Sequence, residues 1–536
     1  MERVEDGYEK LQILVMLLIK EAGLENLNSI IGCKLANSAT ILNRNLENSL
    51  KISQKHFAIR TNIIEAIKNL SPTQSAKWIS KLDEITEIEG EMKSFLDPES
   101  KDLKELQQDA LSQLSFQSHD LKCLNYIPYA LSLMAIFKVW VIPGLAIITP
   151  IIAWILPYIF LRFLYNLPIT QEKYNEILGM FLAGTPIQFN LPTIPQPTAN
   201  PFNMRSLIQY AFMAFSFAQS LIQPIQNAMH LNKIDSKLIE NGSKVAKLKE
   251  HYDFFVNEFN RLGLQHSFRR PLEIVGDGDA RTAVHLLIEQ PERIQIALRD
   301  LSELEVMWRL VHSPLLKSAE VITRGDYPLL IGTNIIDIAL GDSAVASSFT
   351  LNATENHAAL TGPNGGGKSS FMRAVLQSVL ISHAYGLAPA DKFIVRRFGW
   401  ISSGLRLQDR PGDLSMFESE VFFASEILKR GDGKNGFGLI LYDELFHSTN
   451  PPDGIRTAET FLKQLWTKPY IVSIVSTHVF DLVESAPKMV KKICCNAAEV
   501  DGRIAFSYKV VPGVSKISSV SEIWDRFGLV AGKVPV

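Results

Sequence analysis

The chain has 536 residues, a length that exceeds one ordinary core and predicts two to four domains. Hydrophobic residues make up 46% of it and charged residues 21%, which are globular values and exclude a wholly disordered protein. The net charge of −2 excludes a globally basic protein that coats DNA, although local basic patches stay open.

Residues 1–122 have the pattern of a helical region. Ile63, Ile64, Ile67 and Leu70 recur at helical spacing, with charged residues on the other face. Glycine is scarce in this stretch, so we expect a bundle of helices. The first ten residues show no basic segment followed by an apolar core, so no signal peptide is expected.

Residues 123–232 form an apolar insert. The run 139–161 has no charge and lies between Lys138 and Arg162, and it is long enough to cross a bilayer. The run 206–232 also lacks Asp, Glu, Lys and Arg, but it contains four glutamines. Two interpretations stay open, a transmembrane hairpin and the buried core hairpin of a soluble domain.

Lysine-rich flanks on both sides of the insert would place both flanks in the cytoplasm if the two runs cross a membrane. Arg162 and Arg205 would then stand at the far interface, against the usual charge bias. After the insert, residues 233–320 are charged and amphipathic and predict further helices.

Residues 321–536 alternate short apolar runs with helical stretches. This alternation predicts an α/β domain with a mainly parallel sheet and helices on both faces, preceded by a mostly α-helical region. Four cysteines, Cys33, Cys123, Cys494 and Cys495, lack metal-site spacing and are expected to be reduced, buried or inert thiols in a cytosolic compartment.

The strongest local signal is Gly362-Pro-Asn-Gly-Gly-Gly-Lys368-Ser369, which fits the pattern G-x-x-x-x-G-K-[ST] of a P-loop. An apolar run precedes it and a helical run follows it, as that loop requires. Backbone N–H groups and the helix N-terminus would hold phosphate oxygens, Lys368 would reach the β- and γ-phosphates, and Ser369 would bind Mg²⁺.

Two further strands end in polar residues. Leu439-Ile-Leu-Tyr leads into Asp443 and Glu444, predicted to hold Mg²⁺ and to polarise the attacking water. Tyr470-Ile-Val-Ser-Ile-Val leads into Ser476-Thr477-His478, and His478 is predicted to reach the γ-phosphate or that water. The expected cofactors are therefore ATP and Mg²⁺.

The runs TGPNGGGKSSFMRA, LILYDELFHSTNPPDG and STHVFDL resemble the ATPase domain of the MutS mismatch-repair family. The segment Ser415-Met-Phe-Glu-Ser-Glu420 is similar to the family's Ser-x-Phe-x-x-Glu, whose serine lies near the partner subunit's nucleotide. The resemblance implies a dimer and DNA as the partner. The nucleotide-binding residues it implies are Thr361, Gly362, Pro363, Asn364, Gly365, Gly366, Gly367, Lys368, Ser369, Ser370 and Ser415.

The chain also departs from this family. After the acidic pair it has Phe446-His447-Ser448-Thr449 where the family usually has Gly-Arg-Gly-Thr. No mismatch-reading domain with a Phe-x-Glu wedge is visible. Residues 1–122 and 233–320 could be the family's two lever arms, with the insert 123–232 standing where its DNA clamp would be.

We therefore expect a Mg²⁺-dependent ATP hydrolase related to mismatch repair that acts as a homodimer on DNA. Its catalytic residues would be Lys368, Glu444 and His478, and its metal ligands Ser369 and Asp443. The alternative is a membrane-anchored ATP-driven mechanical or scaffold protein, attached through 139–161 and 206–232. The ATPase domain is expected in the cytoplasm, or in the nucleus of a eukaryote if the chain is soluble.

Two minor alternatives complete the sequence predictions. A transporter-type ATPase would carry an L-S-G-G-Q signature before the acidic strand, and Ser415-Met-Phe-Glu does not match it. The pairs Arg269-Arg270 and Arg396-Arg397 could contact DNA phosphates, but such pairs usually form solvated faces.

Overall fold

The computed structural model describes residues 16–93, 112–182, 204–264, 279–405, 415–444, 448–500 and 503–517, with residues 101, 104, 108, 268, 272 and 446. They form two compact units. Unit 1 comprises the described residues of Met1–Asp83, Glu258–Phe268 and Leu298–Val536, and unit 2 those of Glu84–Asn257 and Arg269–Ala297. The predicted pair Arg269-Arg270 lies outside the described residues.

The helices of unit 1 come from both the start and the middle of the chain. They are η1 (Leu24–Asn26), α2 (Leu27–Ile31), α3 (Ser38–Glu47), α4 (Gln54–Lys68), the first part of α5 (Pro72–Glu91), the end of α11 (Met204–Arg261) and most of α13 (Pro291–His312). The helical spacing read from the sequence is confirmed in α4, where Ile63, Ile64 and Ile67 are buried.

Helix α13 is fixed to the N-terminal helices by a buried carboxylate. Glu305 is 1% exposed and accepts hydrogen bonds from the backbone N–H of Lys34 and Leu35 at 2.8 and 2.9 Å. The hydroxyl of Ser38, the first residue of α3, donates to the same carboxylate at 2.7 Å. These donors satisfy a charge that would otherwise be costly to bury, so α13 and the start of α3 are held together.

The main sheet of unit 1 has the strand order β11-β10-β4-β9-β8-β7. All its pairs are parallel except the hairpin of β10 and β11. The strands are β4 (His357–Thr361), β7 (Trp400–Gly404), β8 (Gly438–Tyr442), β9 (Ile471–Ser476), β10 (Val490–Val500) and β11 (Arg503–Pro512). Because β4, β8 and β9 are parallel neighbours, the residues that follow them meet at one edge of the sheet.

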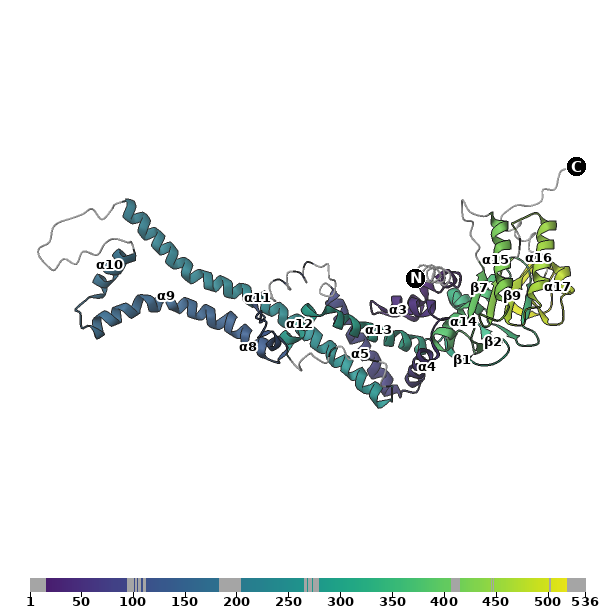
Figure 1. The fold of residues 1–536 in the computed structure, drawn as a ribbon, viewed down its shortest axis with the longest axis horizontal. Helices are drawn as coiled ribbons and strands as arrows, with labels where there is room; N and C mark the ends of the chain where they lie inside the picture. The colour runs from purple at the N-terminus through teal and green to yellow at the C-terminus, as the bar shows by residue number, and fades with distance from the viewer. Residues whose placement is uncertain are drawn as a thin grey trace. The chain divides into compact units, whose positions relative to one another are not determined.

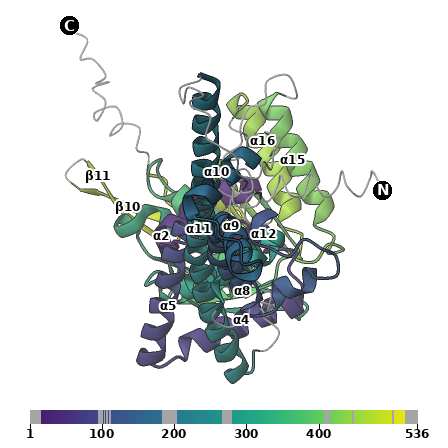
Figure 2. The ribbon, with the colours of Figure 1, turned by 90° about the vertical axis from the view of Figure 1, so that its left-hand side faces the viewer.

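Both faces of the main sheet are covered. Ile440 and Tyr442 pack in one cluster with residues of α15 (Met416–Arg430) and α16 (Pro451–Leu465), which lie side by side in Figure 2. Leu439 and Leu441 point to the opposite face and are also fully buried. A short helix, α17 (Phe480–Glu484), follows β9.

A second sheet of unit 1, with the order β3-β2-β6-β1-β5, was not predicted from the sequence. Only β1 and β6 pair in parallel. Its strands and flanking turn are β1 (Lys317–Ile322), β2 (Leu330–Ile335), η5 (Ile338–Ser343), β3 (Ser347–Leu351), β5 (Leu387–Ala388) and β6 (Lys392–Arg396). Helix α14 (Lys368–Tyr385), buried along most of its length, contacts this sheet and also α3 and α4. The predicted α/β class is thus confirmed, with one mainly parallel and one mainly antiparallel sheet.

Unit 2 is entirely helical among its described residues (Figure 1). It contains the end of α5, η2 (Lys122–Tyr126), α8 (Ala130–Ile136), η3 (Phe137–Val141), α9 (Ile142–Ile159), η4 (Phe160–Leu164), α10 (Gln171–Leu182), most of α11, α12 (Ala280–Glu289) and the start of α13. Helices α11 and α12 approach closely at Gly242, where a Cβ would lie 1.6 Å from the carbonyl oxygen of Ala280.

From Ala130 to Leu164 the backbone is one continuous helix, with π-helical turns at η3 and η4. Among the described residues it is the helix that is long and apolar enough to cross a membrane, on length and composition alone. It contains the predicted run 139–161. The second predicted run, 206–232, lies at the start of α11 and does not pass the same test, because its glutamines lower its hydropathy.

A polar cluster, here called the polar foot, joins α8, α11 and α12. Arg281 donates to both carboxylate oxygens of Asp235 at 2.7 Å and to Ser132 Oγ at 2.9 Å. Asp279 accepts from the backbone N–H of Tyr129 at 2.7 Å and from Ser132 Oγ at 3.3 Å. Burial acts to raise the pKa of Asp279, but these hydrogen bonds and those from α12 outweigh it and lower that pKa.

Replacing Arg281 by alanine is expected to destabilise the protein by about 3 kcal/mol, because it leaves the largely buried Asp235 carboxylate without its bidentate partner. Chemical denaturation of the full chain measures this change. The control is Arg261→Ala, which removes a solvent-exposed ion pair to Glu258 and is expected to cost less than about 1 kcal/mol. Equal effects of the two variants would contradict a stabilising polar foot.

The four cysteines are free, in agreement with the predicted reduced state. Cys494 and Cys495 are buried, and burial raises the pKa of the Cys495 thiol to about 12. Cys33 is partly buried and its pKa is likewise raised by burial to about 12. Cys123 is exposed and so is not one of the buried thiols, and its inertness stays a prediction.

Candidate functional site

The segment Gly362–Ser369, here called the glycine loop, connects the end of β4 to the first turn of α14. Gly362 and Gly367 have φ angles of 141° and 100°, which residues with a Cβ rarely adopt. A Cβ on Gly362 would also lie 3.1 Å from that of Cys495 on β10. The glycines therefore let the loop fold tightly at the N-terminus of α14, where the helix dipole favours an anion.

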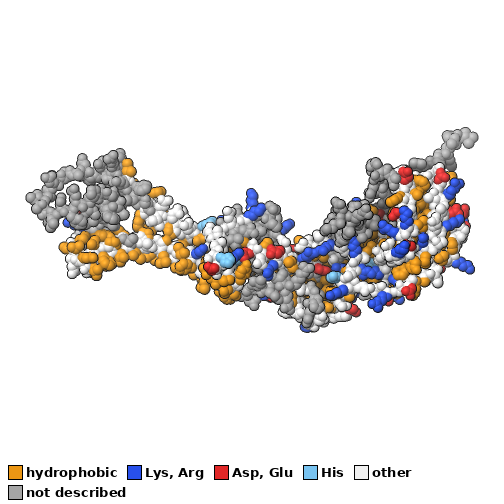
Figure 3. Space-filling model, in the orientation of Figure 1, with side chains coloured by type: hydrophobic (Ala, Val, Ile, Leu, Met, Phe, Trp, Pro, Cys, Tyr) orange, Lys and Arg blue, Asp and Glu red, His pale blue; other side chains and the backbone are white. Residues whose placement is uncertain are grey.

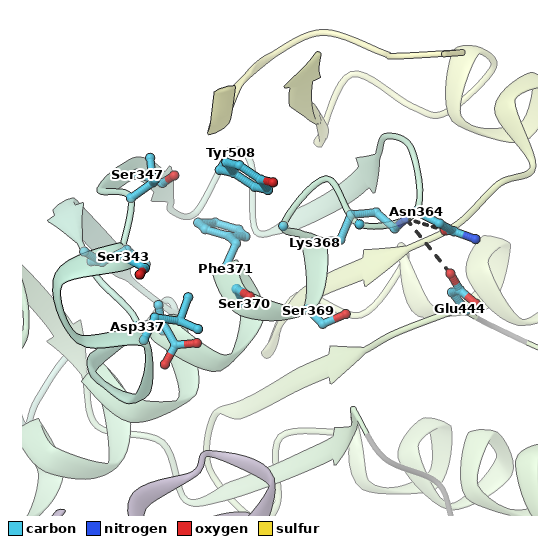
Figure 4. Close-up of a pocket in the computed structure, with 16 residues that line it drawn as sticks. Asp337, Ser343, Ser347, Asn364, Lys368, Ser369, Ser370, Phe371, Glu444 and Tyr508 are labelled. Carbon is cyan, nitrogen blue, oxygen red and sulfur yellow. Dashed lines mark hydrogen bonds and ion pairs between the residues drawn. The ribbon is translucent and has the colours of Figure 1, made fainter. Parts of the chain in front are cut away.

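The ammonium group of Lys368 lies inside this loop. The residue is 5% exposed, and Nζ donates to the carbonyl oxygens of Gly362 and Pro363 at 3.1 and 3.3 Å. It also donates to Asn364 Oδ1 at 3.1 Å and lies 4.0 Å from Glu444 Oε1 (Figure 4). A buried positive charge is thus held by neutral oxygens that an anionic ligand could replace.

The acidic pair follows β8 and meets the glycine loop. Ser369 Oγ donates to Asp443 Oδ2, and Ser476 Oγ, from the end of β9, donates to Asp443 Oδ1 at 2.5 Å. The same Ser476 oxygen accepts from the backbone N–H of Glu444 at 2.9 Å. No role was predicted for Ser476, but the structure shows that it contacts the Asp443 carboxylate and the backbone of Glu444.

Glu444 has a strained backbone and a histidine neighbour. Its φ of 54° lies in the left-handed region, which is costly for a residue other than glycine and is often found at functional sites. His478 Nε2 lies 3.2 Å from Glu444 Oε1, and both side chains are partly exposed. The three residues predicted as catalytic, Lys368, Glu444 and His478, are thus neighbours.

Phe446 explains one departure from the MutS pattern. It stands where that family usually has glycine, and its φ is 53°. Its ring is buried against Phe417 and Phe461, with ring centroids 6.3 and 6.1 Å away. Aromatic packing therefore accompanies a backbone conformation that glycine adopts without strain. His447 of the same departure lies outside the described residues.

A cavity of about 570 Å³ lies beside the glycine loop (Figure 4). Asn364, Gly365, Lys368, Ser369 and Ser370 line it on the loop side, and Glu444 lines it as well. Side chains from η5 and the turn after it, from β11 and from α14 form an apolar wall, which was not predicted from the sequence. The residues of this wall include Leu340, Val345, Phe371, Ala374 and Tyr508. The cavity therefore combines a polar phosphate-sized end with an apolar and aromatic end.

Asp337 also lines the cavity and links it to the rest of unit 1. It is 3% exposed and pairs with Arg373 of α14 at 2.7 Å. Gln377, one turn further along α14, donates to Asp337 Oδ1 and to the carbonyl oxygen of Ala22, both at 2.8 Å. A continuous hydrogen-bonded path thus runs from the cavity wall through α14 to the N-terminal helices.

The remaining predicted residues have structural contacts. Thr361 ends β4, is fully buried, and accepts from the backbone N–H of Ser515 at 3.0 Å. Ser415 caps α15, where its hydroxyl and the carboxylate of Glu418 form a capping box. Such a box satisfies the helix terminus by itself, so any role of Ser415 toward a second subunit remains a prediction.

In the arginine pair of unit 1, Arg396 is buried and Arg397 is partly buried, so the pair does not form a solvated or DNA-facing surface. Arg396 is 6% exposed and stacks on Tyr327, with its guanidinium 4.6 Å from the ring centroid. Arg397 donates to the carbonyl oxygens of Ser49 and Ile52 at 2.9 and 3.0 Å. The suggestion that this pair contacts DNA phosphates is therefore wrong, because both guanidinium groups hold unit 1 together.

The glycine loop, the acidic pair and His478 occupy the ends of three adjacent parallel strands. Residues 358–525 match the family model of MutS domain V. This match supports membership of the MutS family, of which domain V is the ATPase domain. It covers every residue of the site from Thr361 to Tyr508, and it leaves residues 1–357 to be described from the structure.

Within the region matched to MutS domain V, the residues that fit a magnesium ion are Ser369 and Asp443. Their hydroxyl and carboxylate are already in hydrogen-bond contact, and hard oxygen ligands suit Mg²⁺. Among the described residues there is no group of three or more His, Cys, Asp or Glu placed to hold a metal. This pair suits an ion that takes its other ligands from water and phosphate.

Removing the ring of Tyr508 is expected to weaken binding of ATP about tenfold, because stacking on an aromatic side chain stabilises a base by about 1–3 kcal/mol. Tyr508→Ala would be compared with Tyr508→Phe, which keeps the ring. The control is Tyr470→Ala, which removes a similarly exposed tyrosine outside the lining of the cavity. Titration with tripolyphosphate, which has no base, should show no change; an equal loss for both ligands would contradict this role.

Proposed function

We propose that this chain is a Mg²⁺-dependent ATPase of the MutS type that couples ATP hydrolysis to movement of its helical regions. The observation that carries the proposal is the convergence of Lys368, Ser369, Asp443, Glu444 and His478 beside the cavity. Water would attack the γ-phosphorus, the bond to the β–γ bridging oxygen would break, and ADP and inorganic phosphate would leave.

Each residue has a chemical role in this proposal. Lys368 exchanges its loop carbonyl partners for β- and γ-phosphate oxygens, and Ser369 with Asp443 holds Mg²⁺. Glu444 orients the attacking water, and His478 contacts that water or the γ-phosphate. The apolar wall with Tyr508 receives the adenine base. The direct test is turnover by the full chain with Mg²⁺ and with a chelator, and equal rates would contradict the metal's role.

The contacts of α14 support a coupling between nucleotide and helices. The glycine loop leads directly into α14, whose Gln377 binds the carbonyl of Ala22. At its other end, Tyr385 accepts from Asn45 of α3 at 3.0 Å, and Arg60 of α4 donates to the Ala384 carbonyl at 2.8 Å. A small shift of this buried helix would therefore move α3 and α4, in the way expected of a lever.

A homodimer is part of the proposal, with Ser415 of one copy near the nucleotide of the other. The surface of α15 that follows Ser415 supports this, because Phe422 and Val421 are 59% and 39% exposed. Phe422→Asp is expected to lower the fraction of dimer at least tenfold, measured by analytical ultracentrifugation with and without ATP. Arg430→Asp, which changes charge at the far end of α15, is the control, and an unchanged dimer fraction in Phe422→Asp would contradict the interface.

DNA is the proposed object of this ATPase, because the MutS domain V match relates the chain to mismatch repair. Fluorescence anisotropy with homoduplex and mismatched heteroduplex DNA, over a series of salt concentrations, tests this directly. A DNA-binding chain should lose affinity steeply as salt rises. Weak binding without salt dependence would contradict DNA as the partner, and equal affinity for the two duplexes would contradict mismatch recognition.

A further inference from the structure

The helix from Ala130 to Leu164 in unit 2 buries Leu131, Ala135 and Val139 near its start, but beyond Pro143 it is apolar and largely exposed. Ile151, Ile152, Trp154, Ile155 and Leu156 are each between 39% and 50% exposed, although they point in different directions around the helix. Only 12% of its most apolar stretch of 18 residues is buried. The space-filling view shows these hydrophobic side chains along α9 (Figure 3).

This distribution identifies what covers the helix. A helix that docks into a groove of another protein has one apolar stripe and an opposite polar face, whereas a helix that is apolar all round belongs in a core or a membrane. Beyond Pro143 the described residues of unit 2 do not bury the helix, so this part is no core helix of unit 2. A lipid bilayer covers all sides of a helix at once.

The helix Ala130–Leu164 is here called the first limb, and the start of α11, from Met204 to Asp235, the second limb. The two limbs are matched in length. Ser132 on the first limb and Asp235 on α11 both bind Arg281 of the polar foot. Thirty positions separate Ser132 from Arg162, and thirty separate Arg205 from Asp235. At 1.5 Å per residue each limb extends about 45 Å, the thickness of a bilayer with its headgroups. Arg162 on the first limb and Arg205 on the second limb are therefore equally far from the polar foot.

A cavity of about 400 Å³ between the limbs supports this antiparallel register. Pro143 and Ala146 of α9 line it together with Pro224 and Asn227 of α11. Pro143 lies eleven positions after Ser132, and Pro224 eleven positions before Asp235. Near the polar foot, positions that are equally far from the foot on the two limbs thus lie opposite each other. Farther from the foot the two limbs separate toward α10 (Figure 1).

The geometry points to a membrane hairpin, in which Ala130–Leu164 crosses a lipid bilayer and the start of α11 returns through it. The polar foot would lie at one interface, on the side where ATP is available, and α10 would lie beyond the other. Because both limbs begin at the same foot, the chain crosses twice or not at all. This inference concerns where the ATPase works and is independent of the proposed reaction.

Charged and aromatic residues stand where the two interfaces would be. Lys138, near the foot, donates from Nζ to the carbonyl of Gln113 at 2.6 Å, and the adjacent Trp140 is 68% exposed. Arg162, at the far end, donates to Tyr158 Oη at 2.9 Å. Tryptophan, tyrosine and basic side chains prefer the headgroup layer, and the run between Lys138 and Arg162 has no charge.

The glutamines of the second limb fall on one stripe. Gln219, Gln223 and Gln226 recur at helical spacing, and exposed Ile222, Ile225 and Met229 recur on the neighbouring face. Pro224, Asn227 and Leu231 form the face toward the first limb, so the glutamine stripe is free to pack against a second copy while Ile222, Ile225 and Met229 contact lipid. A polar stripe in this position explains why 206–232 is less apolar than a lone transmembrane helix requires.

Flotation of the full chain with sealed phosphatidylcholine vesicles tests membrane insertion. The wild-type chain should float and resist extraction by carbonate, and Ile155→Lys should lower the floating fraction at least tenfold. Ile30→Lys is the matched control, because Ile30 is 38% exposed and Ile155 is 39% exposed, but Ile30 lies outside the hairpin. A wild-type chain that stays soluble, alone or as an oligomer that buries the helix, would overturn the inference.

Thiol labelling distinguishes a spanning hairpin from one that lies on the surface. Cys123, exposed just before the hairpin, is a natural reference on the side of the polar foot. Glu176→Cys adds a thiol at an exposed position of α10. In sealed vesicles a membrane-impermeant maleimide should modify Cys123 and spare the thiol introduced at 176 until detergent is added. Equal labelling of both before detergent would overturn the spanning arrangement.

Discussion

Lys368→Ala is expected to weaken ATP binding by at least about a hundredfold. The ammonium is the positive charge inside the glycine loop, and its loss removes charge-assisted hydrogen bonds that stabilise a bound phosphate by about 3 kcal/mol or more. Isothermal titration of the full chain with ATP and Mg²⁺ measures this directly. Lys463→Ala, which removes an exposed ion pair on α16, should leave the affinity unchanged.

The folded state of the Lys368→Ala chain needs its own measurement, because the wild-type ammonium also binds the carbonyls of Gly362 and Pro363. These carbonyls adjoin the cavity, so water can replace the lost donor, and thermal unfolding should shift little. A stable Lys368→Ala chain with wild-type ATP affinity would exclude the glycine loop as the phosphate site.

Much of this site could be predicted because its residues follow strands that are easy to recognise. The glycine loop has a fixed spacing, and Asp443, Glu444 and His478 each come directly after a short apolar run. Parallel strands bring such residues to one edge of a sheet. The structure accordingly places Ser369 against Asp443 and His478 against Glu444.

The apolar wall of the cavity could not be predicted in this way. Tyr508 stands in β11, one of many aromatic residues in the chain, and reaches the cavity because the β10–β11 hairpin has an irregular register near it. Asp337 lies before the glycine loop in an irregular turn with no motif around it. Their places depend on the second sheet, whose mainly antiparallel pairing has no signature in the sequence.

For the membrane hairpin, the composition of the sequence predicted an apolar helix but not how the two limbs are arranged. The uncharged run 139–161 predicted a long apolar helix, and the structure extends that helix to Ala130–Leu164. Arg162 and Arg205 count against a transmembrane model when only the charge bias is considered. Their equal separation from Ser132 and Asp235 becomes visible only after Arg281 is seen to bind both limbs.

Glu444→Gln is expected to lower the turnover of ATP by about a hundredfold to a thousandfold while leaving ATP bound. The amide keeps the shape of the side chain but cannot accept a proton from, or strongly polarise, the attacking water. The backbone should stay in place, because the N–H of residue 444 donates to Ser476 whichever side chain is present. Single-turnover hydrolysis and equilibrium binding, measured on the same sample, separate the two effects.

The negative charge of Glu444 next to Lys368 also predicts how Glu444→Gln should affect ATP affinity. Glu444 Oε1 lies 4.0 Å from Lys368 Nζ and lines the cavity that would hold the triphosphate. Neutralising it removes a repulsion between carboxylate and phosphate, so affinity for ATP should be unchanged or higher. Glu426→Gln, an exposed acid on α15 paired with Lys429, should alter neither quantity. If Glu444→Gln hydrolyses ATP at nearly the wild-type rate, another residue must orient the water, and the adjacent His478 becomes the group to replace next.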